Sequence, residues 1–264
     1  MSTSETPDES KLVSALARGI NILNCFSPVQ YELSAKEIGE KTGLPKPTLF
    51  RLLDTLSEYG LIRYSDRLSK FVPGAGLLNL SAPVLQRMTI RQIARPLMQE
   101  LANHISGQVQ LVMGSKSKMC YVEIAQGANS KIYRPEVGVR MSISKTSTGR
   151  AYINSIPPEF RERYLTDLEK KYPGQRAWFE ERLQDAANDL EKLGFCRGHR
   201  DFHREIDAIA VPLRKPIDNE YWMFAASVPV YSEESKHIDE DIAPRLITLV
   251  RTVESSLGNP NYSI

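Results

Sequence analysis

An α+β protein with two domains is predicted by three features of the sequence. Within the first 75 residues, a short helix, a glycine turn and a leucine-striped helix precede a β-hairpin. A leucine-rich helical segment then separates this part from the rest. Beyond residue 90, strand-like segments are grouped around helices, which is typical of an α+β domain. The predicted segments are a disordered tail (1–10), a winged helix-turn-helix domain (11–75), a linker helix (76–90) and an α/β domain (91–260).

The composition is that of an ordinary globular protein. With 264 residues, of which 41% are hydrophobic and 25% charged, the chain can bury two cores. Its formal net charge of +2 identifies no partner, so a nucleic-acid surface must be local. The three cysteines are widely spaced and indicate neither a disulfide framework nor a zinc finger. The sequence shows no signal peptide and no apolar run of about 20 residues, so we expect a cytoplasmic protein without membrane partner or cofactor.

Cap signals predict a helix-turn-helix in the first domain. Ser34 and Glu37 form a capping box before a short helix through Thr42, and Gly43 supplies the positive φ of the turn. The polar and acidic residues 1–10 predict the disordered tail. A helix over 11–26 should precede the motif, with one helical stripe made of Leu12, Leu16, Gly19, Ile20 and Leu23.

The second helix of this motif, from Pro45 to its stop at Gly60, has a leucine face and a polar face. The leucines fall at i, i+3, i+4 and i+7, which fixes the helix to a core; they are Leu49, Leu52, Leu53 and Leu56. Donors and one aromatic ring occupy the first two turns of the other face, where a recognition helix meets base edges. By itself the pattern also fits an ordinary surface helix. The preceding turn and the hairpin predicted at 61–72 favour a winged helix that reads DNA.

The linker segment 77–88 predicts a helix with a kink at Pro83, because an interior proline removes a backbone hydrogen bond. Its four leucines leave more apolar surface than an isolated helix can hide. A partner subunit is the simplest cover, so we expect a homodimer or a homotetramer.

The second domain is predicted to open with a helix over 89–105, started by a capping box at Thr89. Strands and helices then alternate, separated by glycine and proline breaks. The expected strands are 108–113, 118–124, two around Ile132 and Arg140, 195–200, 206–214 and 221–230; the expected helices are 147–155, 158–170, 178–193 and a last one ending at Leu257.

Short motifs along nearly the whole chain, from about residue 10 to 257, resemble the isocitrate lyase regulator (IclR) family of bacterial transcription factors. The motifs follow the order of that family without large gaps. They are Ala15-Leu16-Ala17-Arg18-Gly19-Ile20, Thr42-Gly43-Leu44-Pro45-Lys46, Arg51-Leu52-Leu53, Ala94-Arg95-Pro96-Leu97, Val137-Gly138, Thr146 with Gly149-Arg150-Ala151, Gly194-Phe195 and Ala208-Ile209-Ala210-Val211-Pro212.

The resemblance implies a GAF-like or PAS-like effector-binding domain that controls DNA binding. We therefore expect a sequence-specific regulator of a catabolic operon, with repression the favoured sign, double-stranded operator DNA as partner and a small organic carboxylate as effector. It also implies a phosphate contact for Arg18. The expected DNA-binding residues are Arg18, Ser34, Lys36, Lys46, Pro47, Thr48, Phe50, Arg51 and Lys70.

Hydroxyl side chains from Ser142 to Thr148 lie where a helix should begin, and a helix N-terminus is an anion site. The alternative is that Ser144 or Thr146 only caps a structural helix. The resemblance places the effector loop on this segment and further pocket positions on Asp207, Ala208 and Ser227. Two departures from many relatives are Ala208, where they have cysteine, and Pro229, where they have serine. The expected effector residues are Met113, Tyr121, Tyr133, Ser144, Lys145, Thr146, Asp207, Ala208 and Ser227.

Three aromatic residues and Met113 indicate which class of organic acid the pocket favours. Tyr121, Tyr133, Met113 and Phe224 can line an apolar part of the pocket and then favour an aromatic acid; the alternative for each is a place in the core.

One other constellation suggests a different class of protein, a metal-dependent sensor or an enzyme. His199 and His203 flank Asp201, and Cys196 could act as a nucleophile beside His199. Further metal ligands and a nucleophile elbow are missing. DNA binding that is lost in recognition-helix variants, but not on chelation, would separate this reading from the regulator.

Overall fold

The computed structural model describes residues 13–115, 117–198 and 200–258. The chain divides between Arg87 and Met88 into two compact units, each described by itself below. The predicted disordered tail, 1–10, lies outside the described residues. Within them, no helix is both long and apolar enough to cross a membrane.

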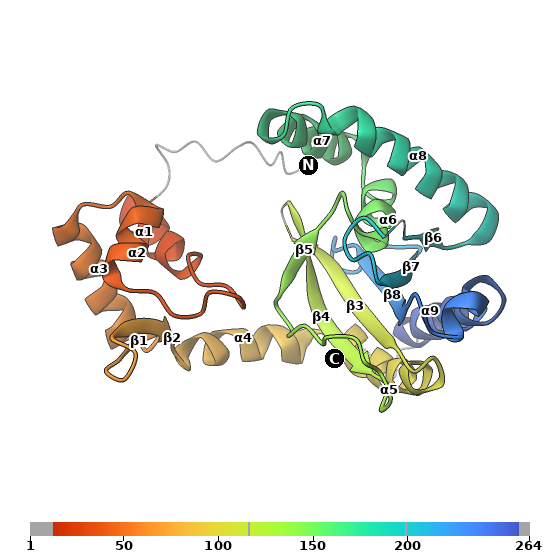
Figure 1. Ribbon diagram of the computed structural model, residues 1–264, viewed down its shortest axis with the longest axis horizontal. Coiled ribbons are helices and arrows are strands. Elements are labelled where there is room, and N and C mark those ends of the chain that lie inside the picture. Colours follow the sequence, from red (N-terminus) through yellow and green to blue (C-terminus); the bar gives the residue numbers. More distant parts are fainter. Residues whose placement is uncertain (1–12, 116, 199, 259–264) are drawn as a thin grey trace. The chain divides into compact units, whose positions relative to one another are not determined.

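The first unit contains the predicted helix-turn-helix. Helix α1 spans Ser14–Leu23, α2 Ala35–Thr42 and α3 Lys46–Glu58 (Figure 1). The capping box is confirmed: the Ser34 side chain accepts a hydrogen bond from the Glu37 amide at 3.2 Å, and the Glu37 carboxylate accepts one from the Ser34 amide at 2.7 Å. Gly43 ends α2 with a φ of 67°, a conformation that glycine adopts without strain.

The recognition-type helix α3 is fixed at its C-terminal end and along one side. The amide of Gly60 donates to the carbonyl of Ser57, and the amide of Leu61 donates to that of Leu56. This pair of bonds is the Schellman arrangement, which needs the left-handed residue that Gly60 provides at φ 64°. The predicted leucine face is confirmed, since Leu49, Leu53 and Leu56 are buried and Leu52 packs against them.

The stripe predicted for α1 is buried only in part. Gly19 and Ile22 are buried and Leu23 packs against the core, whereas the side chains of Leu16 and Ile20 are 64% and 48% exposed; Leu12 lies outside the described residues. The buried side of α1 is therefore offset from the predicted one, and Val13, Leu16 and Ile20 form an apolar strip that faces away from the core of the first unit.

The predicted wing is an antiparallel pair of strands, β1 (Ile62–Ser65) and β2 (Lys70–Pro73). Residues 74–76 then pass directly against the C-terminal cap of α3. The Gly76 amide donates to the carbonyl of Gly60, and a Cβ on Gly74 would lie 2.1 Å from that carbonyl oxygen. Only glycine permits this approach, so the start of the next helix is held against the end of α3.

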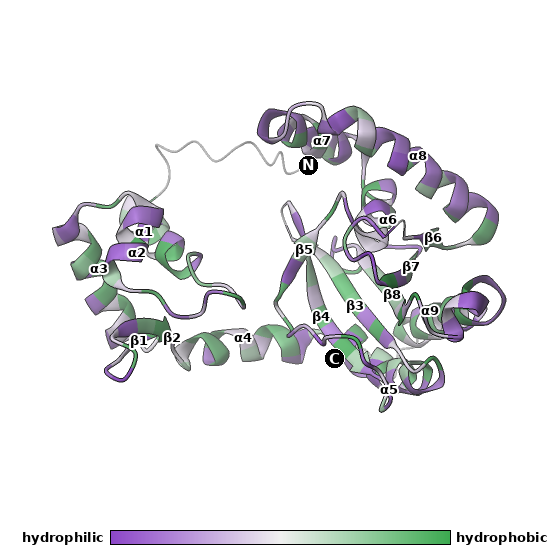
Figure 2. Ribbon diagram, viewed as in Figure 1, coloured by the Kyte–Doolittle hydropathy of each residue, from purple (hydrophilic) through white to green (hydrophobic). Residues whose placement is uncertain are grey.

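Helix α4, Gly76–Arg87, is the predicted linker helix and includes Pro83. None of its residues is buried. Leu78, Leu80 and Val84 expose 71%, 65% and 54% of their surfaces. Figure 2 shows the resulting hydrophobic stretch along α4.

The second unit is built on an antiparallel sheet with the strand order β5-β4-β3-β8-β7-β6 in the described residues. The side-chain alternation of each strand divides its residues between the two faces. The strands are β3 (Gln108–Ser115), β4 (Lys118–Gln126), β5 (Arg140–Ser142), β6 (Cys196–Arg197), β7 (Ile206–Pro212) and β8 (Trp222–Pro229).

Helices cover both faces of this sheet. On one face, α5 (Thr89–His104) and α9 (Ala243–Leu257) pack over a core that includes Val109, Leu111 and Phe224. On the other face lies α6 (Ser147–Ser155), backed by α7 (Pro158–Lys171) and α8 (Gln175–Leu193) (Figure 1). A short 3-10 turn, Glu234–His237, and a π-turn, Ile238–Ile242, lead into α9. The core on the α6 face includes Val112, Ala210 and Met223. It fills only part of its face, which leaves room for the cavity described below.

Two predictions for the second unit are wrong. Helix α5 begins at Thr89 as expected, but Met88 is its N-cap and no side chain caps it. The segment around Ile132 is not a strand. Its carbonyl accepts hydrogen bonds from the side chains of Gln108 and Gln126, so side chains replace the strand neighbour that would otherwise satisfy this backbone.

Candidate functional site

The outer face of α3 presents most of the residues predicted to contact DNA. Lys46, Pro47 and Arg51 are exposed, and Phe50 is 49% exposed. Thr48 is half-buried at the edge of this face. The opposite leucine face is buried, so the geometry leaves the first two turns of α3 free to enter a DNA groove.

The other predicted DNA-binding residues lie outside α3. Arg18 on α1 and Lys36 on α2 are exposed, and Lys70 in the wing is half-buried. Ser34 is engaged in capping α2, since its hydroxyl also donates to the Glu37 carboxylate at 2.8 Å. That network lowers the pKa of Glu37, first through the hydrogen bond from the Ser34 amide.

The second unit contains a cavity of about 680 Å³ over the α6 face of the sheet. This volume suits a small organic molecule. Its floor comes from β3, β4, β7 and β8, and its walls come from residues 131–139, 145–148 and the described residues of 198–206. Small and apolar residues form much of the floor, including Val112, Ala208 and Ala225.

A chain of hydrogen bonds crosses the floor of the cavity. Gln110 donates through Nε2 to Ser227 Oγ and to Gln108 Oε1, both at 3.2 Å. Gln108 donates in turn to the carbonyl of Tyr133 at 3.0 Å. Both glutamines are more than 95% buried and lie at alternate positions of β3, on its cavity face. They are polar groups available to a ligand, and the sequence analysis missed them.

Tyr121 adds a hydroxyl to the same cavity from β4. Burial raises the pKa of this phenol to about 12. The group is therefore neutral over the physiological pH range and can donate a hydrogen bond without carrying a charge.

The N-terminus of α6 forms one wall. Thr146 is its N-cap, and its hydroxyl accepts a hydrogen bond from the Gly149 amide at 3.1 Å while donating to the Ser142 carbonyl at 2.7 Å. Thr146 therefore caps α6, and it also lines the cavity. The amides of Ser147 and Thr148, in the first turn, have no acceptor within the helix, and both residues line the cavity. Helix polarity and these amides favour an anion here.

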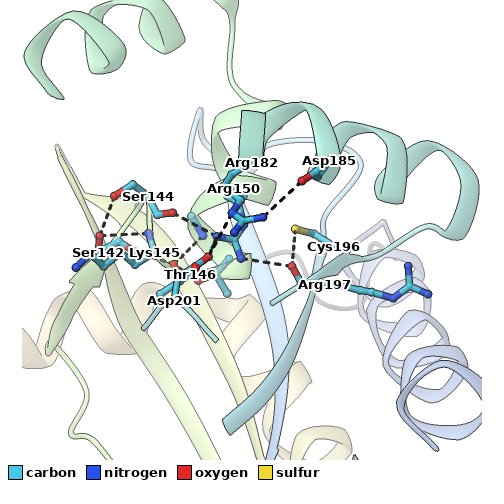
Figure 3. A network of polar contacts seen from close by, with 12 residues as sticks. Ser142, Ser144, Lys145, Thr146, Arg150, Arg182, Asp185, Cys196, Arg197 and Asp201 are labelled. Carbon is cyan, nitrogen blue, oxygen red and sulfur yellow. Dashed lines mark hydrogen bonds and ion pairs between the residues drawn. The ribbon is translucent and has the colours of Figure 1, made fainter. Parts of the chain in front are cut away.

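Arg150, one turn further along α6, is completely buried. Its Nη1 atom lies 3.0 Å from the carboxylate of Asp201, and its guanidinium also donates to the carbonyls of Ser144 and Arg197 (Figure 3). Asp201 lines the cavity, and Nε of Arg182 lies 3.8 Å from the same carboxylate oxygen.

Basic side chains outnumber acidic ones around the cavity. The acids are Asp201, which faces Arg150, and Glu205. Arg200 is paired with Asp207 at 2.6 Å. The basic residues in the lining are Lys131, Arg140, Lys145, Arg200 and Arg204. This excess of positive charge attracts acidic ligands.

Six of the nine predicted effector residues line the cavity, namely Tyr121, Tyr133, Lys145, Thr146, Ala208 and Ser227. The other three lie elsewhere. Met113 points to the opposite face of β3 and packs against the α5 and α9 core, as strand alternation requires. Ser144 is buried beside Ser142, within 3.3 Å of its hydroxyl. Asp207 is directed away from the cavity, toward Arg200 and Ser235.

The residues of the alternative reading do not form a reactive centre in the described part of the chain. Burial raises the pKa of the Cys196 thiol to about 11, so the thiolate needed for nucleophilic attack is disfavoured. Among described residues, no group of three potential ligands could hold a metal ion. His203 lines the cavity and packs edge-on against Phe202, whereas His199 lies outside the described residues.

Comparison with known proteins assigns both units. Residues 15–66 match the family model of the IclR helix-turn-helix domain, and residues 82–257 match that of the bacterial transcriptional regulator IclR C-terminal domain. The chain belongs to the IclR family. Its relatives are transcriptional regulators rather than enzymes, so this IclR-family protein is a helix-turn-helix transcriptional regulator.

Individual relatives span nearly the whole chain. The regulator TsaQ1/TsaQ2 of Comamonas testosteroni is 27% identical, covering 96% of this chain and 93% of its own. The crystal structure of an IclR-family transcriptional regulator from Brucella abortus is 30% identical, with a TM-score of 0.82 and 97% coverage of both chains. An IclR homologue from Microbacterium hydrocarbonoxydans, solved with 4-hydroxybenzoate, has the same fold at 20% identity and a TM-score of 0.75, covering 92% of this chain and 98% of its own.

Proposed function

We propose that this IclR-family regulator represses a catabolic operon and that a small organic acid, preferably aromatic, controls it from the cavity of the second unit. The observation that carries the ligand class is the cavity itself: an excess of basic side chains and the amides of α6 on its walls, and an apolar floor with neutral polar groups. A relative of the same fold binds 4-hydroxybenzoate, which supports an aromatic acid.

A thermal-shift screen of aliphatic and aromatic carboxylic acids tests the ligand class. We expect a subset of the acids to raise the melting temperature of the protein, while the corresponding neutral amides do not. Each hit is then added to a complex of the protein with its own promoter DNA. Because the coupling is reciprocal, the ligand must change DNA affinity by the same factor by which operator DNA changes ligand affinity. Stabilisation by neutral amides alone would contradict the proposal.

Changing Ser227 to leucine tests whether the ligand binds in this cavity. The larger side chain should fill the floor beside Gln110 and remove the hydrogen bond at 3.2 Å, so ligand binding should fall at least about tenfold. Operator affinity should remain that of the wild type because the first unit is unchanged. Ser255→Leu, on the exposed side of α9, is the matched control and should bind ligand normally. A normal ligand response in Ser227→Leu would place the site elsewhere.

We also propose that the protein is a homodimer or homotetramer. The apolar strips of α1 and α4 are too exposed for a lone subunit and suit a second copy of the chain. Light scattering at micromolar concentration should give at least twice the monomer mass of 29.8 kDa. Leu80→Glu on α4 should shift the protein toward monomer, and Glu58→Gln on α3 should not. A monomeric wild type would contradict this assembly.

A further inference from the structure

The positive charge of the buried Arg150 guanidinium is only partly balanced by its hydrogen-bond partners. Its side chain has no exposed surface, and among the described residues its Nε atom has no hydrogen-bond partner. Its contacts among the described residues include two carbonyls, at 3.3 and 3.4 Å, one carboxylate oxygen of Asp201 at 3.0 Å and the neighbouring Cys196 thiol. A buried guanidinium needs a closely placed anion, so Asp201 carries most of this compensation.

The side chain of Asp201 lies between Arg150 and the cavity. It lines the cavity, whereas Arg150 does not, and its side chain is 17% exposed. The same carboxylate lies 3.8 Å from Nε of Arg182, so one acid faces two guanidinium groups (Figure 3). Arg182 has a second acid, Asp185, at 3.7 Å. The first turn of α6 is adjacent to this pair, since Thr146, Ser147 and Thr148 form the neighbouring wall.

We propose that Asp201 is an internal substitute for the carboxylate of the ligand. It neutralises Arg150 in the free protein, and an acidic ligand in the cavity takes its place. This inference rests on the proposed function, because it requires the ligand to be an organic acid. A ligand carboxylate in that position would gain the charge-assisted bond to Arg150 and would lie beside the amides of α6.

The exchange has a regulatory consequence. Asp201 ties the cavity-lining residues 200–206 to α6 through its contact with Arg150. When the ligand replaces this carboxylate, the tie is lost, so bound and free protein differ in the attachment of that segment. A ligand that favours one of two arrangements can shift their populations. The competition with Asp201 also weakens ligand binding, because only the fraction of molecules with Asp201 displaced is competent.

The test uses benzoate and acetate as probes, with wild type and two variants. Asp201→Asn keeps the shape of the side chain and removes the competing charge, so it should bind benzoate about tenfold to a hundredfold more tightly than wild type. Asp201→Ala should melt roughly 10 °C lower than wild type, because it leaves Arg150 uncompensated. Saturating benzoate or acetate should restore at least about half of this loss. Isothermal titration and thermal denaturation measure the two effects.

Glu123→Gln is the matched control. Glu123 is also a buried carboxylate paired with an arginine, Arg91, at 2.7 Å, but it lies on the α5 face of the sheet and does not line the cavity. Its neutralisation should leave benzoate affinity unchanged. In crystals of Asp201→Asn with 4-bromobenzoate, the carboxylate of the probe should lie within hydrogen-bond distance of Arg150, with the bromine located by anomalous scattering.

The outcomes separate this inference from the proposed function. Equal benzoate affinity of wild type and Asp201→Asn, or a bromobenzoate carboxylate placed away from Arg150, overturns the exchange and leaves an acid-responsive regulator standing. Tight benzoate binding to Asp201→Asn, with none to wild type, also overturns the exchange, because it shows that an acid does not displace Asp201 from Arg150. Binding to neither protein contradicts both.

Discussion

Gly149→Ala is expected to destabilise the second unit by about 3 kcal/mol or more, because it forces two backbone segments apart. A Cβ on Gly149 would lie 2.0 Å from the carbonyl oxygen and 2.5 Å from the carbonyl carbon of Ile143. Neither atom can rotate away as a side chain could. For a unit of this size, the melting temperature should fall by roughly 6–12 °C, which differential scanning calorimetry measures.

The same substitution should abolish the ligand response, since α6 would leave its place at the cavity wall. Operator binding should persist at temperatures where the first unit remains folded. Gly258→Ala is the control: it makes the same chemical change at the end of α9, where the nearest atoms lie at 3.6 Å and the φ of −76° suits alanine. If Gly149→Ala melts like this control, α6 does not approach Ile143 as closely as described.

Arg51→Ala is expected to cost about 1–3 kcal/mol of operator binding, seen mainly as lost discrimination between operator and unrelated DNA. The reason is its position on the exposed face of α3, within the first two turns that can meet base edges. Fluorescence anisotropy with operator and scrambled duplexes at several salt concentrations measures the loss.

Arg18→Ala provides the contrast for Arg51. As a phosphate contact it should weaken all duplexes alike and reduce the salt slope by about 1. A metal chelator should not change the DNA affinity of either variant. Wild-type operator affinity in Arg51→Ala would show that α3 does not read bases through this residue.

The sequence predicted those elements whose signals are local. The capping box of Ser34 and Glu37, the turn at Gly43 and the stop at Gly60 each depend on residues within a few positions, and each is confirmed. The pattern at Thr89 failed because a capping box also needs a chain direction into the helix that places the side chain over the first amides. Met88 occupies the cap instead.

Predictions failed where the structure of a segment depends on residues far away in the sequence. The strand predicted around Ile132 is a segment held by the side chains of Gln108 and Gln126, which no local pattern reveals. On α1, Leu16 and Ile20 share the periodicity of the stripe but are exposed, because periodicity marks an apolar face without showing what covers it.

The cavity was predicted in part for a similar reason. Hydroxyls at 142–148 marked the helix N-terminus, but Gln110 was overlooked as a polar residue in an otherwise apolar strand. Its alternation with Gln108 was the available signal. Asp201 was considered only as a possible metal ligand between two histidines. Its partner Arg150 lies 51 residues away in sequence, so only the fold brings them together.

The glycine junction at residues 74–76 couples the orientation of α3 to that of α4. Because the Gly60 carbonyl is bonded to the first amide of α4, the recognition helix cannot turn independently of the linker helix. The twelve residues of α4 extend about 18 Å. A tilt of roughly 10° about the far end of α4 therefore carries the base of the recognition helix about 3 Å, close to the 3.4 Å rise of one base pair. A small angular change that breaks no contact within the first unit would thus shift α3 by about one base pair along a DNA duplex.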